Sequence, residues 1–127
     1  MNSMTMIRIG DVLTRPKALG FVTHTGVAIA PGWVLHNTPE KGEHATTVHD
    51  FSAGQVVAVH RTGLNPSVVI ARARSVLGNP RDYHPIGNNC EHTVTKVIHG
   101  ISKSPQVIFF AIIALLLGVL WLMLRQR

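Results

Sequence analysis

Residues 107–124 form an unbroken run of 18 residues without a charge, and the sequence ends three residues later. The run reads VIFFAIIALLLGVLWLML, and 13 of its 18 residues are Leu, Ile, Val or Phe. As an α-helix with a rise of about 1.5 Å per residue it spans roughly 27 Å, close to the hydrocarbon thickness of a bilayer. These side chains favour insertion by roughly 5 kcal/mol. The run therefore predicts a transmembrane helix from Val107 to Leu124.

The flanks of this run favour a membrane helix over a buried helix of a soluble core. A soluble helix presents a polar face to water, and this run has none. Trp121 lies near its C-terminal end, where an amphipathic ring is favoured at the membrane interface. Lys103 precedes the run, and Arg125 and Arg127 follow it, so their cations can reach the headgroups. We therefore expect a single-pass C-terminal anchor.

The rest of the chain is long enough for one domain with its own core. We expect this domain over residues 1–101, a linker over 102–106, the membrane helix over 107–124 and a basic end over 125–127. The N-terminus has no apolar stretch of secretory length, so we expect the domain to stay on the side of synthesis and face the cytosol. The single cysteine, Cys90, excludes an internal disulfide and is consistent with a reducing compartment.

The charge of the chain indicates which partners to expect. Twelve Lys and Arg stand against six Asp and Glu, a formal net charge of +6 with His neutral. This excess favours anionic headgroups, at roughly 1 kcal/mol per base near a membrane surface. The bases are scattered and no nucleic-acid motif accompanies them, so we expect membrane phospholipids as partners, with no nucleic acid and no obligate protein partner. The histidine spacing matches no strong zinc pattern, and we expect no metal and no other cofactor.

Apolar periodicity and turn residues predict strands in the first half of the domain and helices in the second. Strands are predicted over 8–14, 21–30, 33–36 and 55–60, with loops over 15–20 and 38–49 and a hairpin turn at Pro31-Gly32. Helices are predicted over 65–77, capped by Asn65 with Pro66 in first position, and over 90–99, ended by Gly100.

The main chemical motif is Asn88-Asn89-Cys90-Glu91-His92. If an Asn caps the helix, Cys90 lies in its first turn, where unpaired backbone N–H groups and the helix dipole stabilise a thiolate. The same N–H groups could form part of an oxyanion hole. Cys90 is therefore the candidate nucleophile. Glu91 is expected to be a first-turn residue that the helix dipole favours, and His92 points away from the thiol and is expected to be structural.

A thiol nucleophile needs a base, and His24 and His36 stand out because the predicted hairpin relates them. With a two-residue loop the two rings would point to opposite faces of the sheet. With an odd-length loop His24 would pair with Thr38, and His36 would be a diagonal neighbour on the same face at about 7–8 Å. A catalytic role therefore predicts an odd loop or a bulge. The other histidines are expected to be solvated or hydrogen-bonded: His44, His49, His60, His84 and His99.

These residues resemble a known family. His24-Thr-Gly-Val-Ala-Ile, His36 twelve positions later and the string Asn89-Cys90-Glu91-His92 are similar to the H-box and NC motif of the lecithin:retinol acyltransferase-like proteins, relatives of NlpC-type hydrolases. The resemblance implies an α+β, circularly permuted papain-like (NlpC-type) domain with a small antiparallel sheet packed on helices, plus one C-terminal membrane helix. Thr25 and Thr93 stand where the family usually has aromatic residues.

The resemblance also implies a catalytic triad. In it Cys90 is the nucleophile, His24 is the general base, and His36 orients and polarises His24. Three further residues are implied as support for the motif: Asn89, Glu91 and Tyr83. The implied reaction is acyl transfer from a glycerophospholipid ester, through a thioester on Cys90, to water or an amine. This is the activity of a cysteine-dependent phospholipase A or acyltransferase.

Two other functions compete with this one. The first is a thiol peptidase or amidase of the NlpC type, acting on peptide or wall fragments, which would need export. The second is a non-catalytic, tail-anchored interaction module that keeps the fold. An enzyme and a non-catalytic module differ in the reactivity expected of Cys90. An enzyme predicts labelling much faster than free cysteine, whereas a binding module predicts an ordinary thiol with a pKa of about 8.5.

Overall fold

The computed structural model describes residues 6–17 and 22–127. Its described residues form a five-stranded antiparallel sheet in the order β4-β3-β2-β1-β5, so the predicted α+β class is confirmed. The strands are β1 (Val12–Lys17), β2 (Val22–Ala30), β3 (Trp33–Thr38), β4 (Gly42–Thr47) and β5 (Ala58–His60). The helices are α1 (Val48–Ser52), α2 (Pro66–Gly78), α3 (Cys90–His99) and α4 (Pro105–Arg125).

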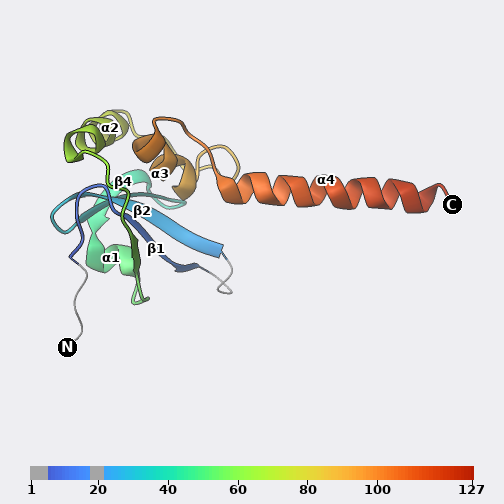
Figure 1. The fold of residues 1–127 in the computed structure, drawn as a ribbon, viewed down its shortest axis with the longest axis horizontal. Coiled ribbons are helices and arrows are strands. Elements are labelled where there is room, and N and C mark those ends of the chain that lie inside the picture. The colour runs from blue at the N-terminus through green and yellow to red at the C-terminus, as the bar shows by residue number, and fades with distance from the viewer. Residues whose placement is uncertain (1–5, 18–21) are drawn as a thin grey trace.

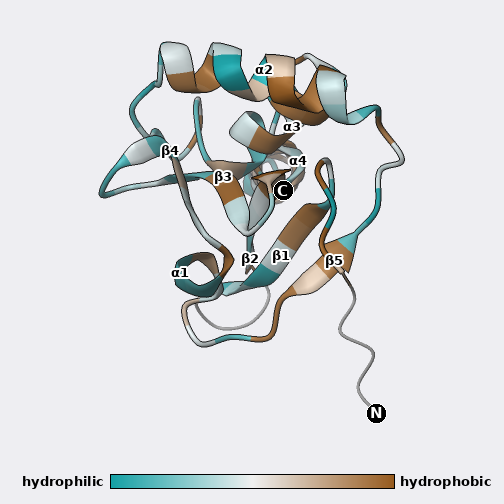
Figure 2. Cartoon of the chain, turned by 90° about the vertical axis from the view of Figure 1, so that its left-hand side faces the viewer, coloured by the Kyte–Doolittle hydropathy of each residue, from teal (hydrophilic) through white to brown (hydrophobic). Residues whose placement is uncertain are grey.

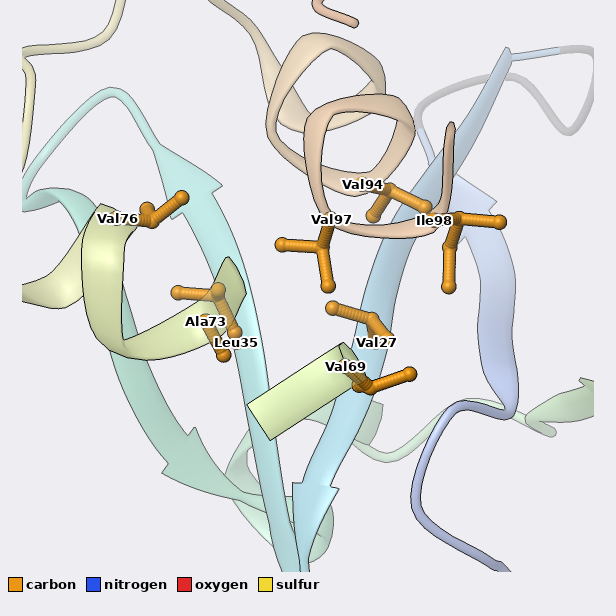
Figure 3. Packing of buried hydrophobic residues seen from close by; sticks show 8 residues of the cluster. All are labelled: Val27, Leu35, Val69, Ala73, Val76, Val94, Val97 and Ile98. Carbon is orange, nitrogen blue, oxygen red and sulfur yellow. The ribbon is translucent and has the colours of Figure 1, made fainter. Parts of the chain in front are cut away.

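The sheet separates two apolar clusters. Helices α2 and α3 lie together on one side of the sheet, and α4 extends away from the domain (Figure 1). The larger cluster joins this face of the sheet to both helices through Val27, Leu35, Val69, Ala73, Val76, Val94, Val97 and Ile98 (Figure 3). Figure 2 shows hydrophobic residues interleaved with hydrophilic ones along α2, as in an amphipathic helix. Burying each Val or Leu of this cluster contributes about 1.5–3 kcal/mol.

The smaller cluster lies on the opposite face, where Leu13 and Val34 pack with Phe51 of α1. Gly26 allows this close approach. A Cβ added at Gly26 would lie 2.6 Å from a Val34 methyl carbon and 2.8 Å from the Phe51 ring. The absence of a side chain at Gly26 therefore lets Phe51 reach the middle of the sheet.

Local signals located several elements correctly. The second strand, the Pro31-Gly32 turn and the two predicted helices appear as β2, the β2–β3 turn, α2 and α3. The Asn65 side chain caps α2 by accepting from Ser67 N at 2.9 Å. Gly100 ends α3 with φ of 75°, a left-handed conformation that glycine adopts without strain. The structure confirms these predictions. They could be made from sequence because each depends on residues adjacent in the chain.

The first predicted strand and the loop after it need correction. The strand β1 begins at Val12 rather than residue 8, and it continues through Arg15 and Pro16 to Lys17, which the sequence predicts as loop. The reason is that β5 pairs with β1 only as far as Thr14, so the rest of β1 is an edge on that side, where proline is tolerated. The remainder of the predicted loop, 18–20, and the first residue of the next strand, Phe21, lie outside the described residues.

Two further segments were predicted wrongly. The segment 38–49 is not a loop, because it contains β4 and the start of α1. This segment lacks the apolar alternation typical of a strand, because polar residues of β4 such as Glu43 are buried and hydrogen-bonded to residues distant in sequence. The strand predicted over 55–60 is only Ala58–His60. Within the segment 102–106, which the sequence assigns to the linker, Ser104 caps α4 and Pro105 begins it.

Candidate active site

A bulge in the β2–β3 hairpin brings the two candidate histidines together. Ala30 pairs with Trp33 but Ala28 pairs with Val34, so the register shifts by one residue between them. This is the bulge that the sequence predicts. Because side chains alternate along a strand, the shift places His24 and His36 on the same face. His24 Nε2 lies 2.8 Å from His36 Nδ1.

Both rings are buried against Phe51. Its ring stacks on His24 at 5.4 Å between centroids and meets His36 edge-on at 5.5 Å. Burial lowers the pKa of His24 to about 3, and the neighbouring His36 and Arg15 contribute in the same direction. Burial also lowers the pKa of His36 to about 4, with His44 as the next cause. Both imidazoles are therefore neutral at physiological pH and able to accept a proton.

Because His24 and His36 are buried in their neutral forms, we expect the domain to lose stability in mild acid. In the unfolded chain both histidines take up protons near pH 6.5, whereas in the folded domain their pKa values are far lower. The unfolded state therefore binds more protons as pH falls, which costs roughly 2 kcal/mol per histidine between pH 7 and pH 5. We expect the urea midpoint of the full chain in detergent to fall over this range. The exposed-site variant His49→Gln should show the same fall, and a constant midpoint would contradict neutral burial.

The start of α3 lies between the two strands that carry the histidines. The β2–β3 ladder ends at the pair Val27–Leu35. Beyond it, Asn37 of β3 donates from Nδ2 to the carbonyl of Asn88 at 2.9 Å. On the other side, the backbone N–H of Thr25 in β2 lies close enough to the Cys90 thiol to lower its pKa. The sulfur thus lies against the peptide group that joins His24 to Thr25.

Asn89 caps α3, as predicted, and it occupies two of the N–H groups there. Its side-chain oxygen accepts from the backbone N of Glu91 at 3.0 Å and of His92 at 3.3 Å. In return, the Asn89 backbone N–H donates to His92 Nδ1 at 3.2 Å, which completes a capping box and gives His92 the structural role expected for it. In the part of the chain that the structure describes, the backbone N–H of Cys90 makes no hydrogen bond. That N–H is the candidate oxyanion donor.

The sequence predicts that this helix start stabilises a thiolate, and the burial of the Cys90 thiol contradicts that prediction. Burial raises the pKa of Cys90, while the Thr25 N–H and Lys17 oppose the rise only in part. Cys90 is only 5% exposed, and the Glu91 N–H, which also donates to the Asn89 side chain, opposes the rise only in part. The resting site is therefore a neutral thiol beside neutral imidazoles, and the proton must leave as the sulfur attacks.

The thiol and the imidazoles are neighbours without a direct bond. Within residues 6–17 and 22–127, no hydrogen bond joins Cys90 Sγ to the ring of His24 or His36. His24 uses Nε2 to bond His36, and its Nδ1 bonds no described residue. Nδ1 is therefore the nitrogen of His24 that remains to take the thiol proton.

Cys90 opens on a pocket of about 140 Å³. Tyr83, predicted as a supporting residue, lines this pocket together with Val22 and Lys17. The Lys17 ammonium lies 5.9 Å from the centre of the Tyr83 ring, a cation–π contact. The sequence did not single out Lys17, because it assigned this residue to a loop. Recognising an edge strand that runs through Pro16 would have placed Lys17 beside the cysteine.

Glu91 joins α3 to the membrane-length helix α4. Its carboxylate accepts from the backbone N of Gln106 at 2.9 Å and from the Gln106 side chain at 2.7 Å, and it also accepts from the Ser104 hydroxyl. A carboxylate at this position interacts favourably with the positive, N-terminal end of α4. The first two turns of α4, with Val107 and Phe110, then form a wall of the cysteine pocket. The prediction for Glu91 concerned only its own helix.

A third histidine extends the pair. His36 Nε2 lies 3.0 Å from His44 Nε2, and His44 Nδ1 lies 2.8 Å from the carbonyl oxygen of Gly42. The sequence predicted only a solvated or hydrogen-bonded role for His44. Recognition of β4 would have revealed this contact, because His36 and His44 are directly paired in the β3–β4 register. Among the described residues, no cluster of three His, Cys, Asp or Glu is arranged to hold a metal ion.

The C-terminal helix α4 is the one described helix long and apolar enough to cross a membrane. The predicted span, Val107 to Leu124, lies inside it, and none of its residues is buried against the domain. Near its end, the Arg125 guanidinium lies 5.3 Å over the Trp121 ring. Such a pair suits the interface of a bilayer.

One comparison with known proteins gives a match. A protein-family model with the description "Lecithin retinol acyltransferase" matches residues 5–103. The matched part covers most of the chain and contains His24, His36 and Cys90, and it ends just before α4. No curated protein matches the chain.

Proposed function

The chain belongs to the lecithin retinol acyltransferase family and has an α+β fold consistent with that family's permuted papain-like (NlpC-type) architecture, and from this premise we propose that it is a membrane-anchored, cysteine-dependent phospholipase A or acyltransferase. Membership supports an enzyme of the acyltransferase or hydrolase type. One observation carries the finer proposal. The cysteine at the start of α3 shares its pocket with the first two turns of a helix long enough to span a bilayer.

In the proposed first half-reaction, His24 Nδ1 takes the Cys90 proton as the sulfur attacks the carbonyl carbon of a glycerophospholipid ester. The backbone N–H of Cys90 donates to the developing oxyanion. The intermediate collapses by breaking the ester C–O bond, and His24 returns the proton to the leaving oxygen. The products are a lysophospholipid and a thioester on Cys90.

In the second half-reaction, water or an amine attacks the thioester carbon. His24 takes a proton from this nucleophile and gives it to the sulfur when the C–S bond breaks. The contact of His36 with His24 Nε2 keeps the His24 ring oriented during both transfers. A neutral His24 suits this role, because an already protonated imidazole could not act as the base.

The proposed substrate fits the surroundings of the pocket. Val22, Val107 and Phe110 offer apolar contacts to an acyl chain, and α4 would hold them at the membrane surface. Lys17 lines the same pocket and offers a cation to the phosphate of a headgroup. The tether also keeps substrate at a high effective concentration. We propose that the domain faces the cytosol, where a single free cysteine stays reduced.

The test is to incubate the full chain in detergent micelles with mixed phospholipids that include anionic lipids. We expect mass spectrometry to show lysophospholipid and an acyl adduct on Cys90 that hydroxylamine removes. A folded chain that forms neither product would overturn the proposal. Cleavage of peptide amides under the same conditions would instead favour an NlpC-type amidase, and no turnover of either substrate class would favour an interaction module.

A further inference from the structure

Three imidazole rings and one backbone carbonyl form a single chain of hydrogen bonds across β2, β3 and β4. His24 Nε2 lies 2.8 Å from His36 Nδ1, and His36 Nε2 lies 3.0 Å from His44 Nε2. The chain ends where His44 Nδ1 lies 2.8 Å from the carbonyl oxygen of Gly42. Each link has the length of a true hydrogen bond, and each ring nitrogen in it has one partner.

The carbonyl at the end of this chain fixes the direction of every link. A carbonyl oxygen only accepts, so His44 Nδ1 must carry the hydrogen. In a neutral His44 ring Nε2 is then an acceptor, so His36 Nε2 must donate to it. This makes His36 Nδ1 an acceptor, and His24 Nε2 must donate to His36. The hydrogen bonds thus all point from His24 towards Gly42.

This direction determines which nitrogen of His24 is basic. With its hydrogen on Nε2, a neutral His24 carries its lone pair on Nδ1. Nδ1 is the nitrogen that bonds no described residue, and the Cys90 sulfur lies against the peptide group that follows His24. The opposite tautomer would place a hydrogen on Nδ1 and leave His24 unable to accept the thiol proton from that side.

We propose that His44 is a positioning residue, which acts through His36 to hold His24 in the tautomer whose Nδ1 is free to accept a proton. The inference rests on the proposed function for its catalytic meaning. It extends the implied triad by one residue of β4 and gives the Gly42 carbonyl a role as the fixed end of the chain. His44 touches neither the thiol nor the substrate pocket in the described structure.

Two substitutions of His44 separate a role in tautomer choice from a role in packing. His44→Leu removes the acceptor for the His36 Nε2–H, so His36 can adopt its other tautomer and turn the bond to His24 around. We expect this variant to slow alkylation of Cys90 by a chloroacetamide probe at least tenfold. His44→Gln offers an amide oxygen to His36 Nε2, so we expect its rate within threefold of wild type. The matched control is His49→Leu at an exposed position, which should not change the rate.

The tautomers themselves are read by ¹⁵N NMR of the full chain with labelled histidine in micelles. We expect His24 and His36 in the wild type to carry hydrogen on Nε2, and His36 in His44→Leu to carry it on Nδ1. A wild-type His24 with hydrogen on Nδ1 would overturn the inference, whatever the variants do. So would a folded His44→Leu protein that alkylates at the wild-type rate.

These measurements use no lipid, so they separate the inference from the proposed function. The predicted tautomers and probe rates without any lysophospholipid would support the positioning role and contradict the lipid activity. Lysophospholipid formation at equal rates by wild type and folded His44→Leu would support the lipid activity and contradict the positioning role.

Discussion

Cys90→Ala is expected to reduce lysophospholipid release by the full chain to background, a loss of about 10³-fold or more. The physical reason is that Cys90 is the single cysteine of the chain, so no second thiol can form the thioester. The change removes one buried sulfur at the start of α3, while the Asn89 cap and the contact of Asn37 with the Asn88 carbonyl remain. We therefore expect the variant to fold and to bind vesicles as the wild type does.

A matched control for this prediction is Cys90→Ser, which keeps the size and position of the nucleophilic atom. A hydroxyl loses its proton far less readily than a thiol, so this variant should also be nearly inactive, and any adduct that it forms should resist hydroxylamine. Wild-type release from Cys90→Ala, measured by mass spectrometry on the same vesicles, would exclude a mechanism through Cys90.

The double substitution Leu115→Arg with Leu116→Arg should release the chain from vesicles into the soluble fraction. Both positions lie near the middle of α4 and are exposed, so the change leaves the packing of the domain intact. Each replacement of Leu by Arg at the centre of a span costs roughly 3–4 kcal/mol of insertion free energy. The two together exceed the roughly 5 kcal/mol that the apolar side chains of the whole run contribute.

The measurement is sedimentation of vesicles after alkaline extraction, with Leu115→Ala plus Leu116→Ala as the control that should stay in the pellet. Lysophospholipid release from vesicles should fall with the Arg variant, while alkylation of Cys90 by a water-soluble probe should not change. Retention of the Arg variant in the pellet would show that α4 does not span the bilayer.

Local chemistry explains which elements the sequence located. Asn65 before Pro66, Asn89 before Cys90 and the glycine at position 100 mark helix ends through groups next to them in the chain. The segment from 38 to 49 was missed for the opposite reason. Glu43 of β4 is buried, and two hydrogen bonds make this burial possible. The Thr93 hydroxyl donates to the Glu43 carboxylate at 2.9 Å, and the backbone N of Arg81 donates to it at 2.9 Å. Those partners lie far away in sequence, so no local pattern announces the strand.

The candidate site shows the same division. Residue types and spacing were enough to propose Cys90, His24 and His36 as candidates, and the rule of alternating faces showed that a shared face for the two histidines requires an odd-length loop or a bulge, which the structure contains. The contacts of His44 and Lys17 with this site depend on β4 and on the edge of β1, two features that the sequence did not identify. Thr93 departs from the family pattern, and its hydrogen bonds explain why it is polar: its hydroxyl donates to Glu43 and accepts from Asn37.

By itself the sequence determined the membrane-length helix and the ends of α2 and α3, and it proposed Cys90, His24 and His36 as candidates. The helix and its ends come from residue-by-residue solvent preferences and from contacts within a few positions of the chain. The tertiary structure alone decided that burial raises the pKa of Cys90 despite its place at a helix start. It also decided the direction of the hydrogen bonds from His24 to Gly42 and the joining of α4 to the cysteine pocket through Glu91. Desolvation and hydrogen-bond direction depend on every group that surrounds an atom, and folding brings those groups together from distant parts of the chain.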